Sequence, residues 1–338
     1  MDDPDQLEQE LSIPPPEVVA DLRSLPGDIL ILGAGGKLGP SLAHQAVRAI
    51  REAGTGRRVW GASRFRDESV RRRLEDWGVT TIRADLLEAS GLGELPECSN
   101  VILLAGHKFG SATDPATTWA TNVTLPGMIA RRFSGSRIVA FSTGNVYPLW
   151  PVSSRGPTED DRTDPVGEYA RSAVGRERVL SYLSATRGTP MALLRLNYAI
   201  EPRYGVLHDI AVAVRSGQPI DLAMGHVNVI WQRDANAVAL RSLAHCSTPP
   251  LVLNVTGPET VSVRAVALEF GRMFGLEPGF VGVESDHALL SDATRCRRMF
   301  GPPSMSVPEM IERVGRWLLA GGRSLGKPTG FGEREGRF

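Results

Sequence analysis

From residue 28 onwards, short apolar runs alternate with stretches of helical periodicity. Ile29–Leu32 is a continuous apolar run, which favours a strand buried on both faces of a parallel sheet. Leu42, Ala46 and Ile50 then recur at helical spacing. Further strands are expected at 59–62, from 81 towards 85, and at 101–105, 137–141, 191–196 and 251–255, with helices at 67–77, 116–133 and 168–183 among them. This alternation predicts a doubly wound α/β sheet of the Rossmann type.

The ends and the later part of the chain follow other patterns. The first ten residues carry five carboxylates and Pro14–Pro16 interrupts regular structure, so residues 1–27 are expected to form an appendage with a short helix at 18–25. Residues 323–338 hold four glycines and no apolar period, which predicts a tail. We assign residues 28–197, with 234–255 returning to them, to the Rossmann domain. Residues 198–233 and 256–322, with helices at 208–216, 261–274 and 307–319, form a smaller substrate-binding part.

Composition excludes several classes of protein. The 338 residues are 42% hydrophobic, and 38 Lys and Arg balance 38 Asp and Glu, which argues against a nucleic-acid partner. Three widely spaced cysteines without a CxxC pair predict neither a disulfide framework nor a zinc site, and we expect no metal. No signal peptide and no apolar run of about 18 residues is present. The sequence therefore predicts a soluble, cytoplasmic protein with no membrane contact.

The strongest chemical signal is a glycine-rich turn directly after the first strand. Gly33, Gly36 and Gly39 form a GxxGxxG frame between that strand and a helix, with Lys37 and Leu38 inside it. Glycine permits a tight turn and a close backbone approach to a pyrophosphate, which the helix N-terminus attracts. We therefore expect this segment to bind a dinucleotide.

The end of the second strand indicates which dinucleotide is bound. An NAD site usually places Asp or Glu there to hold the ribose 2′-hydroxyl, but this strand ends in Ser63 and Arg64. A guanidinium and a hydroxyl suit a 2′-phosphate. NADP is therefore the favoured cofactor, with NAD as the alternative.

Several motifs together resemble the extended short-chain dehydrogenase/reductase superfamily, also called the NAD-dependent epimerase/dehydratase family. The resemblance covers about residues 28 to 320. It implies that the segments after the third and fourth strands, the helix asparagine and the end of the sixth strand contact the cofactor: Asp85, Leu86, Leu104, Ala105, Gly106, Lys108, Asn122 and Asn197.

The end of the fifth strand and the helix after it are similar to the family's catalytic motifs. Ser142–Tyr147 resembles the Ser-Ser/Thr-x-x-Val-Tyr motif, which implies that Thr143 touches the reacting substrate oxygen. The resemblance further implies that Tyr169 is the acid/base and contacts the cofactor. His107, Asn145, Tyr147, Arg203 and Trp231 are the candidates for contact with the substrate.

The chain departs from the family at one catalytic position. The family motif is Tyr-x-x-x-Lys, in which lysine lowers the pKa of the tyrosine, and here Ala173 follows Tyr169 in the lysine position. A free tyrosine has a pKa near 10 and is a poor base at neutral pH unless a cation stabilises its phenolate. Three hypotheses retain catalysis: Arg176 supplies the charge, Lys108 supplies it, or Tyr169 acts only as a hydrogen-bond donor.

Two functions of different classes follow. One is an NADP-dependent oxidoreductase or epimerase-like enzyme that transfers hydride to or from a sugar, sugar acid or nucleotide sugar. The other is an inactive dinucleotide-binding module that acts as a redox sensor or as a partner-binding subunit. The resemblance also implies a homodimer that pairs through the helices near 116–133 and 168–184.

Overall fold

The computed structural model describes residues 3–327 and 329–338, and its centre is a seven-stranded parallel sheet. The spatial order is β12-β7-β5-β4-β1-β2-β3. The strands are β1 (Ile29–Leu32), β2 (Val59–Ser63), β3 (Thr80–Arg83), β4 (Asn100–Leu103), β5 (Arg137–Thr143), β7 (Met191–Leu196) and β12 (Leu251–Val255). The strand order reverses between β1 and β4, which is where ligands bind in such sheets. The predicted fold class is confirmed.

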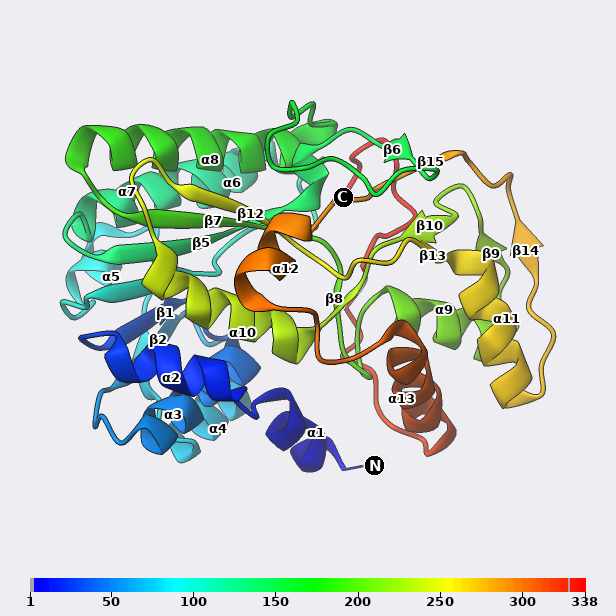
Figure 1. Ribbon diagram of the computed structural model, residues 1–338, viewed down its shortest axis with the longest axis horizontal. Coiled ribbons are helices and arrows are strands. Elements are labelled where there is room, and N and C mark those ends of the chain that lie inside the picture. Colours follow the sequence, from blue (N-terminus) through cyan, green and yellow to red (C-terminus); the bar gives the residue numbers. More distant parts are fainter. Residues whose placement is uncertain (1–2, 328) are drawn as a thin grey trace.

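Helices cover both faces of this sheet (Figure 1). Because successive strand residues point to opposite faces, Ile29 and Ile31 face one layer and Leu30 and Leu32 face the other. The first layer consists of α2 (Pro16–Ser24), α3 (Gly39–Ala53) and α10 (Gln232–Ser242). The second contains α7 (Leu125–Arg132) and α8 (Gly167–Arg187). Both faces of the strands are therefore buried, as the continuous apolar runs predict.

The helix expected over 116–133 is interrupted. α6 (Pro115–Trp119) passes into a π-helical turn, Ala120–Thr124, before α7 begins. Pro126 has no N–H to donate to the carbonyl of Asn122 four residues earlier. The Nε of Arg176 on α8 donates to that carbonyl instead, at 3.1 Å. The carbonyl of Asn122 in this irregular turn thus accepts a hydrogen bond from α8.

A second, smaller part lies beside the carboxyl ends of the strands (Figure 1). Its core is formed by α9 (Val206–Arg215), α11 (Val263–Phe274) and α13 (Val307–Leu319). Four two-stranded sheets also occur outside the central sheet: β6 (Trp150–Pro151) with β15 (His287–Ala288), β8 (Ala199–Ile200) with β11 (Ile230–Trp231), β9 (Ile220–Asp221) with β14 (Phe280–Val281), and β10 (His226–Val227) with β13 (Val261–Ser262). The remaining helices are α4 (Glu68–Asp76), α5 (Ala89–Gly93) and α12 (Thr294–Phe300).

The N-terminal segment is more ordered than its acidic composition predicts. α1 (Pro4–Leu11) begins at the N-cap Asp3, and Leu7 and Leu11, one turn apart, are fully buried in the core of the second part. Glu8 pairs with Arg203 at 2.8 Å. The appendage therefore contributes to the core of the smaller part rather than lying outside it.

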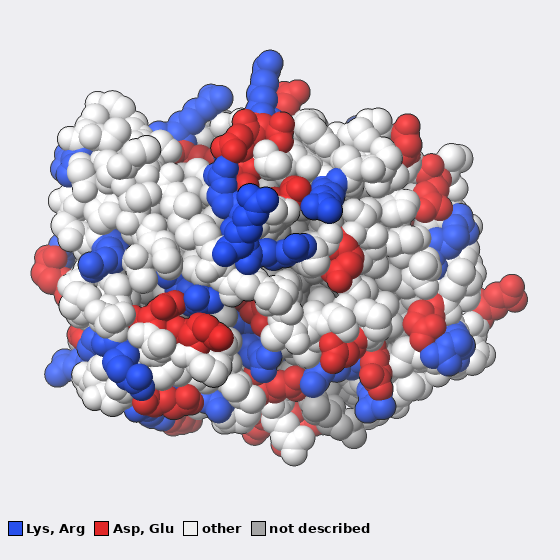
Figure 2. Space-filling view, in the orientation of Figure 1, with Lys and Arg blue, Asp and Glu red and all other residues white. Residues whose placement is uncertain are grey.

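The face of the molecule shown in Figure 2 carries both signs of charge, in keeping with the balanced composition. Within the described residues, no helix combines the length and apolar character that a membrane span requires. Residues 323–327 and 329–338 form no helix or strand, yet they run back between the two parts of the molecule (Figure 1).

Candidate functional site

The glycine-rich turn joins β1 to α3 and leaves no room for side chains at its tightest points. Gly33 has φ +92°, and a Cβ there would lie 2.8 Å from the backbone nitrogen of Ala105. A Cβ on Gly39 would collide with the backbone oxygen of Ala34. Backbone N–H groups and the N-terminus of α3 are therefore accessible to an anion at close range, as a pyrophosphate requires.

Two cavities lie on either side of this turn. The inner cavity, about 320 Å³, lies beside Thr143 and Tyr169, and the outer cavity, about 400 Å³, lies beside Ser63 and Arg64. The predicted cofactor residues that line one or both are Gly33, Gly36, Lys37, Leu38, Gly39, Ser63, Arg64, Asp85, Leu86, Leu104, Ala105, Gly106, Lys108, Tyr169 and Asn197. An elongated dinucleotide fits this paired arrangement, with the turn at its middle.

The outer cavity is rich in cations. Arg64 lies 4.0 Å from Asp85, and both side chains are about half exposed. Arg66 and, from the C-terminal segment, Lys327 line the same cavity. The end of β2 carries the hydroxyl of Ser63 where a carboxylate would hold a ribose 2′-hydroxyl.

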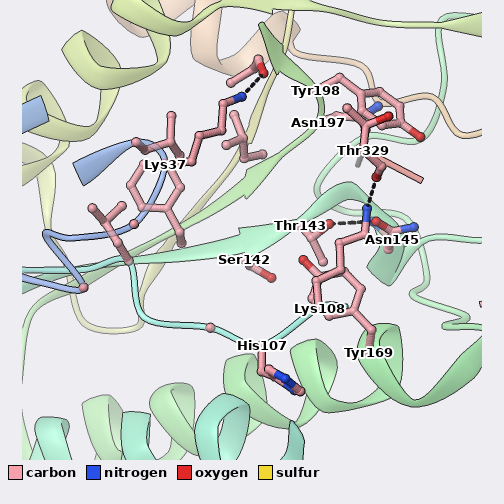
Figure 3. A pocket seen from close by; sticks show the side chains of 18 of the residues that line it. Lys37, His107, Lys108, Ser142, Thr143, Asn145, Tyr169, Asn197, Tyr198 and Thr329 are labelled. Atoms are coloured by element: carbon pink, nitrogen blue, oxygen red, sulfur yellow. Dashed lines mark hydrogen bonds between the residues drawn. The ribbon is translucent and has the colours of Figure 1, made fainter. Parts of the chain in front are cut away.

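Thr143 and Tyr169 meet at the inner cavity (Figure 3). Thr143 is the last residue of β5, and its Oγ1 donates to Oδ1 of Asn145 at 3.0 Å. Tyr169 lies in the first turn of α8. Burial raises the pKa of Tyr169, whereas a hydrogen bond with Thr143 and the charge of Arg176 act to lower it. The two predicted catalytic side chains therefore lie near each other at the same cavity.

Arg176 is the cation most firmly held at this cavity. It lies two helical turns after Tyr169 on α8, and its side chain is buried. Its Nη2 donates to Oδ1 of Asn122 at 2.8 Å, and its Nη1 donates to the carbonyl of Phe141. Ala173, in the lysine position of the motif, is packed against Val146 and Tyr147.

Two lysines also line the inner cavity. Lys37 Nζ donates to the carbonyl of Ala199 at 2.9 Å and lies 3.3 Å from the ring centroid of Tyr204. Burial lowers the pKa of Lys37 to about 7 and the pKa of Lys108 to about 8. Lys108 Nζ lies 5.8 Å from the ring centroid of Tyr169 and donates to the carbonyl of Thr329. A bound anion would favour the charged form of both amines.

Asn122 lies behind the inner cavity, whereas His107 is among the residues that line it. Oδ1 of Asn122 accepts from the backbone nitrogen of His107, and Nδ2 of Asn122 donates to the backbone oxygen of His107, each at 2.8 Å. The His107 ring lies 3.0 Å from Oγ1 of Thr118 and is turned towards the helices below the cavity (Figure 3). The structure therefore assigns Asn122 a structural role and gives the His107 ring a partner other than the substrate.

Three residues expected to contact the substrate have other roles. The hydroxyl of Tyr147 donates to Oδ1 of Asn254 at 2.9 Å and accepts from Arg195, so it belongs to a buried network. Arg203 is paired with Glu8 and Glu201. Trp231 lies fully buried in the core of the second part. None of these three side chains is among those that line the inner cavity, and sequence position does not show which groups they meet.

Sequence reasoning missed the contribution of the C-terminal segment. Thr329 lines the inner cavity and Lys327 lines the outer one. The segment has no apolar period and no motif, so nothing local in the sequence indicated its position. Elsewhere among the described residues, no group of three His, Cys, Asp or Glu side chains is arranged to hold a metal ion.

The fold and the site thus define a dinucleotide-binding Rossmann protein with a Thr–Tyr pair beside the cofactor cleft. Residues 29–223 match the NAD dependent epimerase/dehydratase family, and the chain belongs to this family. Its members are enzymes, and the class of protein expected from the motifs is confirmed. No curated protein sequence matches the chain.

Solved structures share the architecture at low identity. The Bordetella bronchiseptica enzyme WbmG, in complex with NAD and UDP, is 22% identical with a TM-score of 0.73, over 89% of this chain and 97% of that one. UDP-glucose 4-epimerase of Thermus thermophilus, in complex with NAD, is 19% identical with a TM-score of 0.71, over 86% and 99%. UDP-glucuronic acid 4-epimerase of Bacillus cereus, in complex with UDP-glucuronic acid and NAD, is 16% identical with a TM-score of 0.72, over 86% and 99%. These likenesses support the fold.

Proposed function

We propose that this protein transfers hydride between a nicotinamide dinucleotide and a carbon of a sugar, sugar acid or nucleotide sugar, as an oxidoreductase or epimerase. The observation that supports this best is that Thr143 and Tyr169 line the same cavity as the glycine-rich turn. Similar structures hold NAD together with UDP or a UDP-sugar, which supports the same chemical class.

The residues at the site divide the work of proton transfer. The nicotinamide, when bound, supplies or accepts the hydride. Thr143 orients the reacting substrate oxygen, and the hydroxyl of Tyr169 gives or takes its proton. Arg176 offsets the cost of a buried phenolate, since burial alone raises the pKa of Tyr169. The side chains around the cavity exclude bulk water from this exchange.

Tyr169→Phe tests the proposal. The variant is expected to lower kcat by about 100-fold to 10,000-fold on whichever carbohydrate the protein accepts, because the proton donor is lost. NADPH absorbance with a panel of sugars, sugar acids and nucleotide sugars measures net oxidation or reduction, and chromatography of the products measures epimerisation, which regenerates the cofactor. Tyr182→Phe is a matched control, since Tyr182 is on the same helix but 65% exposed.

Wild-type rates that Tyr169→Phe leaves unchanged would overturn the proposed chemistry. Tight cofactor binding without hydride transfer on the whole panel would favour the second function, a dinucleotide-binding module that acts as a sensor or partner-binding subunit. The observation that favours this second function is that Ala173 stands where the family motif has a lysine.

We further propose NADP as the preferred cofactor. The proposal is supported by Arg64 and Ser63, which line the outer cavity and carry groups that suit a 2′-phosphate. Arg64→Ala is expected to weaken NADPH binding by about 10- to 100-fold while changing NADH binding little, since a charge-assisted hydrogen bond is lost. Fluorescence titration with both nucleotides measures this. Arg83→Ala, an exposed arginine outside the cavity, is the control. Equal losses for both nucleotides would remove the 2′-phosphate assignment.

A homodimer and a cytoplasmic location remain predictions. The outer face of α8 carries the exposed Tyr182, and Trp119 on α6 is 39% exposed. These aromatic side chains are the apolar groups that pairing through α6, α7 and α8 would cover. Sedimentation of the purified protein as a monomer would remove the dimer.

A further inference from the structure

The C-terminal segment is bound at many points along its course. We call residues 325–327 and 329–338 the C-terminal strap. The backbone nitrogen of Leu325 donates to the carbonyl of Arg203 at 3.1 Å, and Oγ1 of Thr329 donates to Asp209 on α9. Lys108 Nζ donates to the carbonyl of Thr329 at 2.8 Å. Thr329 is buried, so this stretch is part of the cavity wall.

The far half of the strap is fixed to both parts of the molecule. Arg334 Nη1 donates to the carbonyl of His287 at 2.9 Å, and its Nη2 donates to Oγ of Ser285 at 3.1 Å. Gly336 and Gly167 both have positive φ and their backbones touch, so that a Cβ on either would collide with the other segment. This backbone fit accommodates only glycine on each side.

The last residue of the strap lies against the catalytic tyrosine. The Phe338 ring is edge-on to the Tyr169 ring, with 5.6 Å between centroids, and Lys108 Nζ lies 4.2 Å from the Phe338 centroid. The backbone oxygen of Phe338 accepts from the backbone nitrogen of Ala112 at 3.2 Å. The Phe338 ring therefore packs against one side of the Tyr169 ring.

Little room remains beneath the strap. The space bounded by Asn145, Leu149 and Leu289 on the body and by Arg334 and Phe338 on the strap is about 30 Å³. That is about the share of one water molecule in the liquid. The inner and outer cavities are the ones that the dinucleotide would occupy, so a substrate has only the inner cavity's remaining space beside Thr143 and Tyr169.

We propose that the strap is a fixed wall which excludes the nucleotide part of a nucleotide sugar, and that the substrate is a free sugar or sugar acid. This rests on the proposed function and narrows its substrate class. Thr329 and Arg334 of the strap are hydrogen-bonded to the body, and the Gly167–Gly336 contact needs two glycines, which suits a permanent wall. Among the described residues that line the inner cavity none is Asp or Glu, while Lys108 retains N–H groups for the substrate's hydroxyl or carboxylate oxygens.

Binding of UDP-glucose to the NADP-loaded protein tests the wall without any turnover. Calorimetric titration of the full chain is expected to show no saturable binding at millimolar UDP-glucose. A variant lacking residues 329–338 is expected to gain affinity by roughly tenfold or more, because the covered surface is opened. If the shortened chain does not fold, two point variants replace it. Gly336→Val cannot make the contact with Gly167, and Arg334→Ala loses the hydrogen bond to His287, so each should loosen the strap. Arg337→Ala is the control, since Arg337 is exposed and pairs only within the strap, with Glu335.

The UDP-glucose binding results test the strap independently of the hydride-transfer assay. Saturable UDP-glucose binding to the full chain would overturn the wall, whatever the catalytic result. No gain in UDP-glucose affinity in folded, strap-loosened variants would also overturn it, since another element would then exclude the nucleotide. The protein could exclude UDP-glucose only while its strap is intact and yet transfer no hydride to any free sugar. That result would support the strap as a wall and contradict the proposed function.

Discussion

An Arg176→Met protein is expected to remain folded but to turn over roughly 100-fold or more slowly than the unaltered protein. Arg176 is the charge that opposes the effect of burial on the pKa of Tyr169. Without it the phenolate form of Tyr169 would be costly in a buried site, because no opposite charge would compensate for lost hydration. The loss should fall mainly on kcat.

The structure favours Arg176 over Lys108 for this role. The guanidinium of Arg176 is held by Asn122 and Phe141, and its charge is felt by Tyr169. Lys108 is engaged instead by the carbonyl of Thr329 and the ring of Phe338. In this hypothesis the cation lies two helical turns after the tyrosine, whereas the family motif has it one turn after.

The pH profile separates a catalytic cation from a merely structural one. If Tyr169 acts as a base in substrate oxidation, the rate rises with pH as the tyrosine loses its proton. Removing a nearby positive charge raises the pKa of Tyr169, so the rise in Arg176→Met should occur at higher pH. Arg176→Lys keeps the charge and should recover part of the rate. Arg178→Met, an exposed arginine two residues along the same helix, is the control.

An unshifted profile in Arg176→Met, together with a normal melting temperature, would show that Tyr169 does not depend on this charge. Such a result would return attention to Lys108, or to Tyr169 as a hydrogen-bond donor only. A profile shifted equally by Arg178→Met would point to a general effect of net charge on the assay.

The fold and the glycine-rich turn could be predicted from the sequence because both depend on short-range patterns of residues. Ile29–Leu32 followed by the glycines of residues 33–39 specifies strand, turn and helix within eleven residues. Tyr169 was found in the same way, from a motif on one helix. The absence of lysine at Ala173 was equally visible in the sequence. The sequence did not show whether Arg176 or Lys108 supplies the positive charge in place of that lysine.

The replacement depends on a contact between two helices. One of the acceptors of Arg176 is the carbonyl of Asn122, which Pro126 leaves without its helical donor, and nothing near residue 176 shows this. Tyr147 is a similar case, since its hydroxyl meets Asn254 from a strand far along the chain. The strap is the extreme case, because its position rests wholly on contacts with distant residues such as Gly167 and His287.

The second large effect is expected on stability, from Glu177→Ala. The carboxylate of Glu177 is buried, pairs with Arg195 at 2.7 Å, and accepts from the hydroxyl of Ser142, the residue before Thr143. Removing one partner of a buried pair leaves the other charge uncompensated. The free energy of unfolding should therefore fall by about 3–5 kcal/mol. Urea unfolding of the purified variant measures this loss.

A double variant distinguishes the pair from general damage to α8. Glu177→Met combined with Arg195→Met removes both charges, so it should cost less than the sum of the two single changes. Glu269→Ala, which breaks an exposed pair with Arg272, should leave unfolding nearly unchanged. Additive losses in the double variant would mean that the two charges do not stabilise each other. Ser142, which donates to Glu177, is adjacent on β5 to Thr143. The Glu177–Arg195 pair therefore also helps to position the hydroxyl of Thr143 beside Tyr169. The loss of stability in Glu177→Ala should be accompanied by a loss of catalytic rate.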